Sequence, residues 1–252
     1  MSFYLTYHDF LTLYKLAKVR NQSTANYFSF EAFQGGMLTR YLMSKGVHLS
    51  GSRLLDIGCG FGGYIQAFED EGASVVGLDL TPLDMPGRQI ILGDALTTPT
   101  AEATFDIVVC ASLIEHVAEP LELLKEIWRI LKPGGIFYLS YPPYYSPRGG
   151  HQFSPFHLLG QSTALAIAKR RGLYRREKWL QERFPTDPES FESAFGSWGL
   201  YVLTIAKTRR LLKQLPFETL DCSTRWLPLN FANIPVLGEL LTWHVQFLLR
   251  KQ

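Results

Sequence analysis

The sequence contains few cysteines, and they follow no metal-binding or disulfide pattern. The three, Cys59, Cys110 and Cys222, are far apart and include no C-x-x-C pair. An odd number of isolated cysteines fits neither a disulfide framework nor a zinc site. We therefore predict a protein of a reducing compartment that binds no metal.

Long apolar runs and a strong excess of charge are also missing. No segment reaches the roughly 18 apolar residues of a membrane-spanning helix without a charge, and residues 1–20 lack the basic start and apolar run of a secretory signal. We therefore expect a soluble, cytoplasmic protein. The formal net charge of +2 over 252 residues argues against a chain-wide nucleic-acid-binding surface.

The sequence does contain short apolar runs with few polar interruptions, which are typical of buried parallel strands. A helix predicted at Pro120–Leu131 lies between the last two of these runs, and Lys132–Gly135, "KPGG", predicts a turn back into a strand. Strands that alternate with helices predict an α/β fold with right-handed crossovers. The predicted strands are Arg53–Ile57, Ser74–Leu78, Gln89–Leu92, Phe105–Cys110 and Ile136–Tyr141.

The two flanks differ from this central pattern. Residues 1–50 predict two or three helices, and the last fifty residues predict one helix at 201–215 and strands at 218–226 and 244–250. Residues 142–200, rich in proline, glycine, aromatic residues and arginine, look like an insertion after the fifth strand. We predict a single domain over residues 1–252, composed of a helical cap (1–50), a cofactor-binding core (51–141), a substrate-side insertion (142–200) and a C-terminal helix with strands (201–252).

The glycine-rich stretch "RLLDIGCGFGGY", residues 53–64, satisfies two fingerprints. Gly58, Gly60 and Gly63 form the G-x-G-x-x-G of dinucleotide sites. Asp56 with Gly58, Gly60 and Gly62 forms D-x-G-x-G-x-G, which belongs to a different cofactor. The loop alone does not distinguish the two cofactors, and a tight strand-to-helix turn without any ligand would also require glycines.

Asp56 separates the two cofactors. It lies near the end of an otherwise apolar strand, where an unpaired carboxylate would be costly to bury. A pyrophosphate would be repelled there, whereas the ammonium group of an amino-acid-bearing cofactor would satisfy the charge. We therefore favour S-adenosylmethionine over NAD.

Two further acids follow the next strands. Asp79, 23 residues after Asp56, is placed to accept the ribose hydroxyls, a feature that NAD proteins share. Leu80 would offer an apolar surface to adenine, while Asp94 and the Ala95 amide would bind its polar edge. Each acid alone could equally be a cap or turn residue, but ligands of open α/β sheets bind where these strands end.

The stretches "LLDIGCGFGGY", "VVGLDL", "GDA" and "FDIVVCASLIEHVAEPLELLKEIWRILKPGGIFYLSYPP" together resemble class I S-adenosylmethionine-dependent methyltransferases. They are similar to the small-molecule branch that includes the type 11 and ubiquinone-biosynthesis-like enzymes. The resemblance implies a Rossmann-like seven-stranded sheet in the order 3-2-1-4-5-7-6, with strand 7 antiparallel and helices on both faces. It also implies that Cys110, at the end of strand 4, lies beside the cofactor.

In this topology the segment after strand 5, "SYPPYYSPRGGHQFSPFHLLG", lies over the methyl group. We predict that Tyr141, Tyr144, Tyr145 and Phe153 wall an acceptor pocket, and that His151, flanked by glycines, is a general base. The alternative is that the aromatic residues pack the insertion onto the sheet and that His151 caps a turn.

Two other features have competing interpretations. Glu115 and His116 are an acid and a base in sequence, but in this family such a pair usually belongs to the loop and helix after strand 4, so we favour a structural role. Residues 165–184 carry seven Lys or Arg against two Glu. That segment suits contact with an anionic membrane surface, a phosphate-bearing lipid-linked acceptor or nucleic acid, and it equally suits a solvated helix face.

The predicted activity is in-line methyl transfer to O, N or C of a small-molecule, glycan or lipid-linked acceptor. One alternative is a non-catalytic module that binds S-adenosylmethionine. The other is an NAD-dependent oxidoreductase, which Asp56 disfavours.

Overall fold

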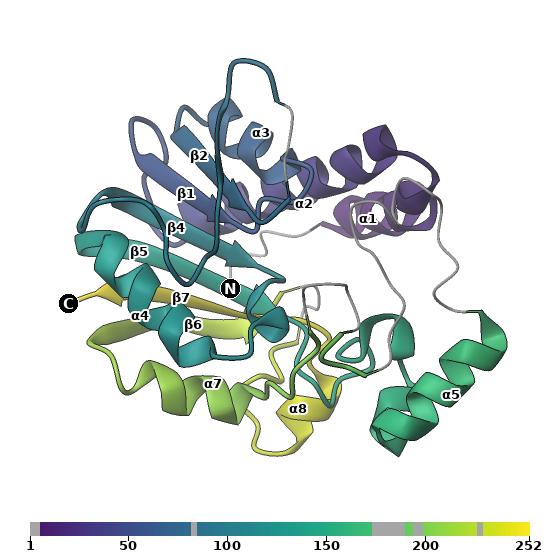
Figure 1. The fold of residues 1–252 in the computed structure, drawn as a ribbon. Coiled ribbons are helices and arrows are strands. Elements are labelled where there is room, and N and C mark those ends of the chain that lie inside the picture. Colours follow the sequence, from purple (N-terminus) through teal and green to yellow (C-terminus); the bar gives the residue numbers. More distant parts are fainter. Residues whose placement is uncertain (1–5, 82–84, 173–189, 194–198, 226–228) are drawn as a thin grey trace. The chain divides into compact units, whose positions relative to one another are not determined.

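The computed structural model describes residues 6–81, 85–172, 190–193, 199–225 and 229–252 and contains one seven-stranded sheet with helices around it (Figure 1). The strand order is β3-β2-β1-β4-β5-β7-β6, and β7 is antiparallel to its neighbours. This order confirms the fold that the family resemblance implies. None of the helices in the described part of the chain combines the length and the hydropathy that a bilayer crossing requires.

The five central strands lie where the apolar runs predict them. β1 pairs in parallel with β2 and with β4, so that Asp56 lies opposite Gly77 on one side and Val109 on the other. Four strands match their predicted bounds within one residue, but β5 begins at Leu131, before the predicted Ile136. Gly134, with φ +75°, bends the chain inside β5 where a turn was predicted. The strands are β1 Arg53–Ile57, β2 Ser74–Asp79, β3 Gln89–Leu92, β4 Phe105–Ala111 and β5 Leu131–Tyr141.

The N-terminal helices confirm the predicted helical start of the chain. In α1 (Tyr7–Val19), the Thr6 and Asp9 side chains form a reciprocal capping box, and the Ser23 hydroxyl caps α2 (Thr24–Ser44). α2 packs closely on α3 (Gly63–Asp70), since a Cβ at Gly35 would lie 2.7 Å from Ala67 Cβ. α4 (Pro120–Ile130) begins at the predicted proline.

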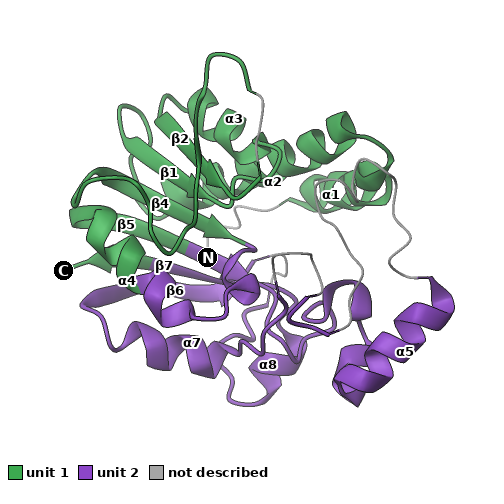
Figure 2. Cartoon of the chain, viewed as in Figure 1, with its two compact units in different colours: residues 1–111, 125–138, 249–252 green, residues 112–124, 139–248 purple. Residues whose placement is uncertain are grey.

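The described chain divides into two compact units (Figure 2). Unit 1 comprises residues 1–111, 125–138 and 249–252, and unit 2 comprises residues 112–124 and 139–248. These limits fall inside α4, β5 and β7 (Val245–Lys251), so the predicted division into four segments remains a prediction. The other elements of unit 2 are α5 Gln161–Arg171, α7 Ile205–Leu212, β6 Phe217–Thr224 and α8 Leu237–Leu241.

Each unit has an apolar core. In unit 1 the apolar side chains of β1 and the Ile65 and Phe68 side chains of α3 are almost completely buried, and Tyr41 of α2 makes an edge contact with Tyr138 of β5 at 6.1 Å between ring centres. In unit 2 a separate cluster holds the inserted segment together through Phe153, Ala164, Leu165, Ala168, Phe191 and Leu200.

Candidate functional site

The glycine loop after β1 has the backbone conformation that its fingerprint requires. Gly58, Gly60 and Gly62 have φ values of +73°, +58° and +81°, in the left-handed region that favours glycine. The Gly58 amide donates to the Leu78 carbonyl at 2.7 Å, which fastens the loop to β2. The three glycines of D-x-G-x-G-x-G are therefore the ones that the loop conformation needs.

Gly63 is a glycine for a different reason. It is the first residue of α3, and a Cβ there would overlap the backbone of α2 at Phe28 and Ala32. The close approach of α2 to α3 therefore accounts for Gly63. Helix packing inside unit 1 therefore explains why Gly63 completes the G-x-G-x-x-G pattern, and no bound dinucleotide is needed to explain it.

Glu31 of α2 is a loop partner that the motif does not reveal. Its Oε2 accepts hydrogen bonds from the Phe61 amide at 3.0 Å and the Gly63 amide at 3.3 Å. Amides at the start of such a helix are those that bind pyrophosphate in dinucleotide sites. Here a carboxylate of the protein takes them, which argues against NAD independently of Asp56.

Asp56 is a buried acid that lacks a complete set of partners. Its exposed fraction is 2%, and Oδ2 has no hydrogen-bond partner among the described residues. Burial, together with the charge of Asp79, raises the pKa of Asp56 to about 7. A cationic group at Oδ2 would stabilise the ionised form, so the ammonium group of an amino-acid-bearing cofactor fits this position.

Asp79 joins the end of β2 to the glycine loop. Its Oδ2 accepts from the Gly60 amide at 3.0 Å, and its Oδ1 accepts from the Thr81 amide at 2.8 Å. These bonds hold the carboxylate in one orientation, and carboxylate oxygens can each accept more than one hydrogen bond. Leu80, the next residue, has an exposed fraction of 50% and is available to a ligand.

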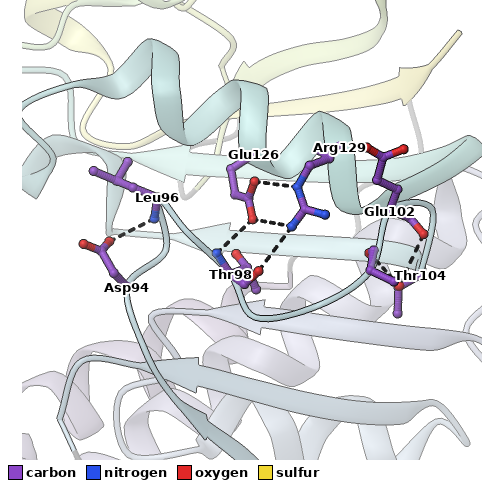
Figure 3. A network of polar contacts seen from close by, with 8 residues as sticks. Asp94, Leu96, Thr98, Glu102, Thr104, Glu126 and Arg129 are labelled. Atoms are coloured by element: carbon purple, nitrogen blue, oxygen red, sulfur yellow. Dashed lines mark hydrogen bonds and ion pairs between the residues drawn. The ribbon is translucent and has the colours of Figure 1, made fainter.

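The remaining predicted cofactor residues differ in exposure. Asp94 is exposed and its Oδ1 accepts from the Leu96 amide at 2.9 Å, so it closes a turn (Figure 3). Ala95 is buried, and Cys110 is completely buried at the end of β4. Asp94 therefore has the turn role that the sequence left open.

A polar network holds the main chain after Asp94 against α4 (Figure 3). Glu126 accepts from the Thr98 amide at 2.8 Å and from the guanidinium of Arg129 at 2.7 Å. Arg129 in turn donates to the Thr98 carbonyl at 3.2 Å. Both backbone groups of Thr98 are thereby fixed, which restrains the segment that follows β3.

In unit 2, His151 lies beside Glu115 and His116, the pair that the sequence assigned to structure. His151 Nε2 is 3.5 Å and His116 Nε2 is 4.0 Å from Glu115 Oε1, and the two imidazole centres are 4.8 Å apart. His151 adopts φ +48°, a conformation that costs about 1–3 kcal/mol for residues other than glycine and often accompanies function. The fold therefore brings the predicted base together with an acid and a second imidazole.

Burial controls the protonation of this cluster. The exposed fraction of Glu115 is 2%, and burial raises the pKa of its carboxyl to about 7, although His116 opposes the shift. Burial lowers the pKa of His116 to about 4. The Gly199 carbonyl, 2.7 Å from His116 Nδ1, can only accept a hydrogen bond, so Nδ1 carries the proton and Nε2 carries the lone pair.

A further histidine belongs to the same part of unit 2. His244 Nε2 is 3.1 Å from the Ser112 hydroxyl, and burial, Arg225 and His151 hold the pKa of His244 well below its usual range. Arg148 stacks over the neighbouring Trp243 ring, with 5.5 Å from the guanidinium carbon to the ring centre. No local pattern in the sequence indicated His244, because its partners come from other segments of the chain.

The predicted acceptor aromatics divide into two pairs. Tyr141 is fully buried, with its hydroxyl 2.5 Å from Thr208 Oγ1, and Phe153 is fully buried in the unit 2 cluster. These two occupy the packing role of the alternative interpretation rather than an exposed wall. Tyr144 is half-buried and contacts Tyr145 at 5.3 Å between ring centres, and Tyr145 has an exposed fraction of 44%.

Comparison with known proteins adds to this geometry. Residues 55–139 match the family described as "Methyltransferase domain". An uncharacterized methyltransferase of Mycobacterium ulcerans (strain Agy99) is 32% identical over 141 residues, which cover 52% of this chain and 55% of the relative. One of Mycobacterium bovis (strain BCG / Pasteur 1173P2) is 34% identical over 126 residues, covering 46% and 49%. The chain spans about half the length of the curated relatives it matches.

Solved structures share the fold over most of the chain. An S-adenosylmethionine-dependent methyltransferase from Mesorhizobium loti superposes with a TM-score of 0.55 and 20% identity, covering 84% of this chain and 96% of that one. The [4+2]-cyclase SpnF superposes with a TM-score of 0.53 and 17% identity, covering 86% and 80%. At these identities the likeness establishes the fold, and the fold supports more than one reaction.

Proposed function

The chain belongs to the class I S-adenosylmethionine-dependent methyltransferases, and we propose that it transfers a methyl group to O, N or C of a small-molecule, glycan or lipid-linked acceptor. The observation that carries the cofactor assignment is the buried Asp56, whose Oδ2 lacks a hydrogen-bond partner beside a left-handed glycine loop. A site for a cationic, amino-acid-bearing ligand explains both features. A dinucleotide would leave the buried Asp56 without a cationic partner, and Glu31 already occupies the Phe61 and Gly63 amides that a pyrophosphate would use.

The methionine portion of the cofactor would be held by the loop and its acid. Asp56 would accept from the ammonium group, and Gly58, Gly60 and Gly62 allow close approach because they carry no side chain. The cofactor supplies a methyl group on a positively charged sulfur, which an acceptor atom can displace in line. The protein contributes orientation, and near-attack positioning can be worth roughly 7–11 kcal/mol.

The nucleoside portion would follow the ends of β2 and β3. Asp79 would accept from the ribose hydroxyls, and Leu80 would cover one face of adenine. Asp94 and the Ala95 amide would bind the polar edge of the ring, with Cys110 as an apolar neighbour. Asp94 must then serve both its turn and the ligand, just as Asp79 must serve both its two backbone amides and the ribose.

His151 is the proposed general base for an acceptor that loses a proton. Glu115 lies 3.5 Å from its Nε2 and would stabilise the imidazolium that forms when His151 takes the proton. A base of this kind contributes typically about 10²–10⁴-fold to the rate. Acceptors that need no deprotonation would depend on orientation alone.

The acceptor is proposed to contact Tyr144 and Tyr145, while Tyr141 and Phe153 support the segment from behind by packing. An acceptor with an apolar or lipid portion is favoured by a group of exposed apolar side chains close in sequence to His244. These are Leu229, Ile234, Val236, Leu237, Leu240, Leu241 and Trp243. If they form one contiguous surface, it would suit contact with an apolar portion of the acceptor.

Contact with an anionic membrane surface remains a proposal based on sequence. Of the basic segment 165–184, residues 173–184 lie outside the described residues. The described part ends with Lys169, Arg170 and Arg171 in the last turn of α5, all of them exposed.

Calorimetry with S-adenosylmethionine, its demethylated product and NAD tests the cofactor. We expect the first two to bind, Asp79→Ala to lose that binding and the exposed Asp70→Ala to keep it. Tighter binding of NAD would overturn the proposal. Incubation of host extract with the labelled methyl donor, followed by separation of lipid and aqueous fractions, then tests turnover and acceptor class. Binding without incorporation into any fraction would favour the non-catalytic module.

A further inference from the structure

We infer that Glu115, His116 and His151 form a binding site for a divalent transition-metal ion. One ligand atom from each residue can be chosen so that all three lie within 4.8 Å of one another. All three residues belong to unit 2, on short 3-10 turns that follow β4 and precede α5 in the chain. This assignment differs from the expectation drawn from the cysteines, because the cluster uses no cysteine.

The orientation of His116 is the one that a metal ligand needs. Its Nδ1–H donates to the Gly199 carbonyl at 2.7 Å, which turns the Nε2 lone pair toward the cluster, 4.0 Å from Glu115 Oε1. Histidines that bind metals almost always donate the other ring N–H to a carbonyl or carboxylate, which fixes the tautomer and the ring plane.

Glu115 provides the second, independent observation. The side chain is 2% exposed, and neither carboxylate oxygen has a hydrogen-bond partner among the described residues. Burying an unsatisfied carboxylate is costly. Its two imidazole neighbours leave room for a cation, since their Nε2 atoms are 3.5 and 4.0 Å from Oε1. A divalent ion between these atoms would neutralise the carboxylate and give it direct ligands.

His151 completes the set and leaves access to solvent. Its side chain is 25% exposed, so an ion can reach the cluster from that side. Two histidines and one carboxylate, with further positions open, form the ligand set of catalytic zinc sites and of non-haem iron(II) sites. In a tetrahedral zinc site with ligand bonds of about 2.0–2.1 Å, the ligand atoms are about 3.3 Å apart. Side-chain rotation would bring the observed atoms to that spacing.

A bound ion would change how the proposed reaction removes a proton, and this consequence rests on the proposed function. With His151 as a ligand, an acceptor hydroxyl at an open position would be acidified by the ion. Its O–H bond breaks and the proton passes to water, the new O–CH3 bond forms, and the S–CH3 bond breaks with its electron pair retained by sulfur. The binding of the ion does not itself depend on this step.

Titration with Co²⁺ tests the site on the whole chain after removal of metal with a chelator and dialysis. We expect one Co²⁺ per chain, with visible absorption of a low-symmetry site, and competition by Zn²⁺. Glu115→Gln and His151→Gln should each weaken Co²⁺ binding at least about tenfold. The matched control His48→Gln, at an exposed histidine of unit 1, should bind as the wild type does.

Circular dichroism and thermal melting show which variants fold. His151 is partly exposed and Glu115→Gln preserves shape, so at least one of the two is expected to fold. Absence of a stoichiometric Co²⁺ complex, or unchanged affinity in both folded variants, would overturn the inference. Binding of S-adenosylmethionine and turnover that survives the chelator would leave His151 as a base and reject the ion's role in proton removal, while the Co²⁺ titration alone decides whether the site exists. Metal binding without S-adenosylmethionine binding would instead reject the proposed function and retain the site.

Discussion

Glu31 Oε2 lies 3.0 Å from the Phe61 amide, so a carboxylate from α2 occupies the donors at the tip of the glycine loop. The same oxygen accepts from the amide of Gly63 at the start of α3. An acid at a helix N-terminus satisfies backbone donors and interacts favourably with the helix dipole. Glu31 therefore couples the N-terminal helices to the loop that is proposed to hold the cofactor.

Replacement of Glu31 by Ala should destabilise the protein by roughly 0.5–2 kcal/mol, the usual cost of removing a helix cap. Affinity for S-adenosylmethionine should fall as well, because the loop loses its anchor. Urea unfolding and calorimetry measure the two effects. Glu71→Ala, at the other end of α3, is the control and should change neither. Unaltered unfolding in Glu31→Ala would show that the loop does not depend on this carboxylate.

Asp56→Asn should stabilise the protein at pH 8 while removing affinity for the cofactor. Burial raises the pKa of Asp56 to about 7 from an ordinary value of 3.8, so the folded state binds this proton more tightly than the unfolded state. The stability contributed by Asp56 is therefore fully present below about pH 4 and is lost as the pH rises through 7. At pH 8 the neutral amide should gain roughly 2–4 kcal/mol over the ionised carboxylate.

Denaturant unfolding at pH 5 and pH 8 checks this stability difference. The advantage of the Asn variant should be smaller at pH 5 than at pH 8, because the folded wild-type carboxyl is protonated at pH 5 and only the unfolded one is ionised. An equal difference at both pH values would mean that ionisation of Asp56 is not its cause. Asp70→Asn, at an exposed position of α3, controls for a general effect of removing an acid.

Cofactor affinity should itself depend on pH. The ammonium group requires the ionised Asp56, so the dissociation constant should fall about tenfold per unit as pH rises toward 7 and then level off. Calorimetry below pH 7 in buffers of different ionisation enthalpy should detect a released proton. Asp56→Asn should bind weakly at every pH. A wild-type affinity that is constant from pH 5.5 to 8 would contradict the ammonium assignment.

His151→Gln should lower kcat by roughly 10²–10⁴-fold and leave the dissociation constant of S-adenosylmethionine unchanged, because a base acts only on the acceptor. Kinetics with an acceptor that must lose a proton measure the rate, and calorimetry measures the dissociation constant of S-adenosylmethionine. His48→Gln should retain full activity. A kcat within about twofold of wild type in a folded His151→Gln protein would remove the base from the mechanism.

Substitutions of Phe153 and Tyr145 should distinguish a role in packing from a role in contacting the acceptor. Phe153 stacks on Phe191 at 4.9 Å between ring centres and is fully buried, so Phe153→Ala should cost about 3–5 kcal/mol of stability. Tyr145→Ala, at an exposed site, should leave stability almost unchanged and raise the KM for the acceptor. Thermal melting and steady-state kinetics distinguish the two, and the reverse pattern would contradict the assignment of both residues.

The amino-acid sequence by itself determined which central segments form strands and where the glycine loop with Asp56 lies. The order of the strands followed from the resemblance of the sequence to a known family. These features depend on short stretches of chain: apolar runs form buried strands, and a tight turn from β1 to α3 needs glycines at fixed spacing. Local chemistry was also sufficient to favour an ammonium group over a pyrophosphate, because an acid at the end of an apolar strand demands a cationic partner.

Only the tertiary structure decided which distant side chains meet. Glu31 reaches the loop because Gly35 and Gly63 let α2 approach α3 closely. Glu115 reaches His151 because their two short turns pack together within unit 2, and neither turn carries a pattern that specifies the other. Packing likewise buried Phe153, which the sequence could equally place on a pocket wall. Spacing along the chain governs local conformation, whereas contacts between segments depend on how complete side chains fill the interior.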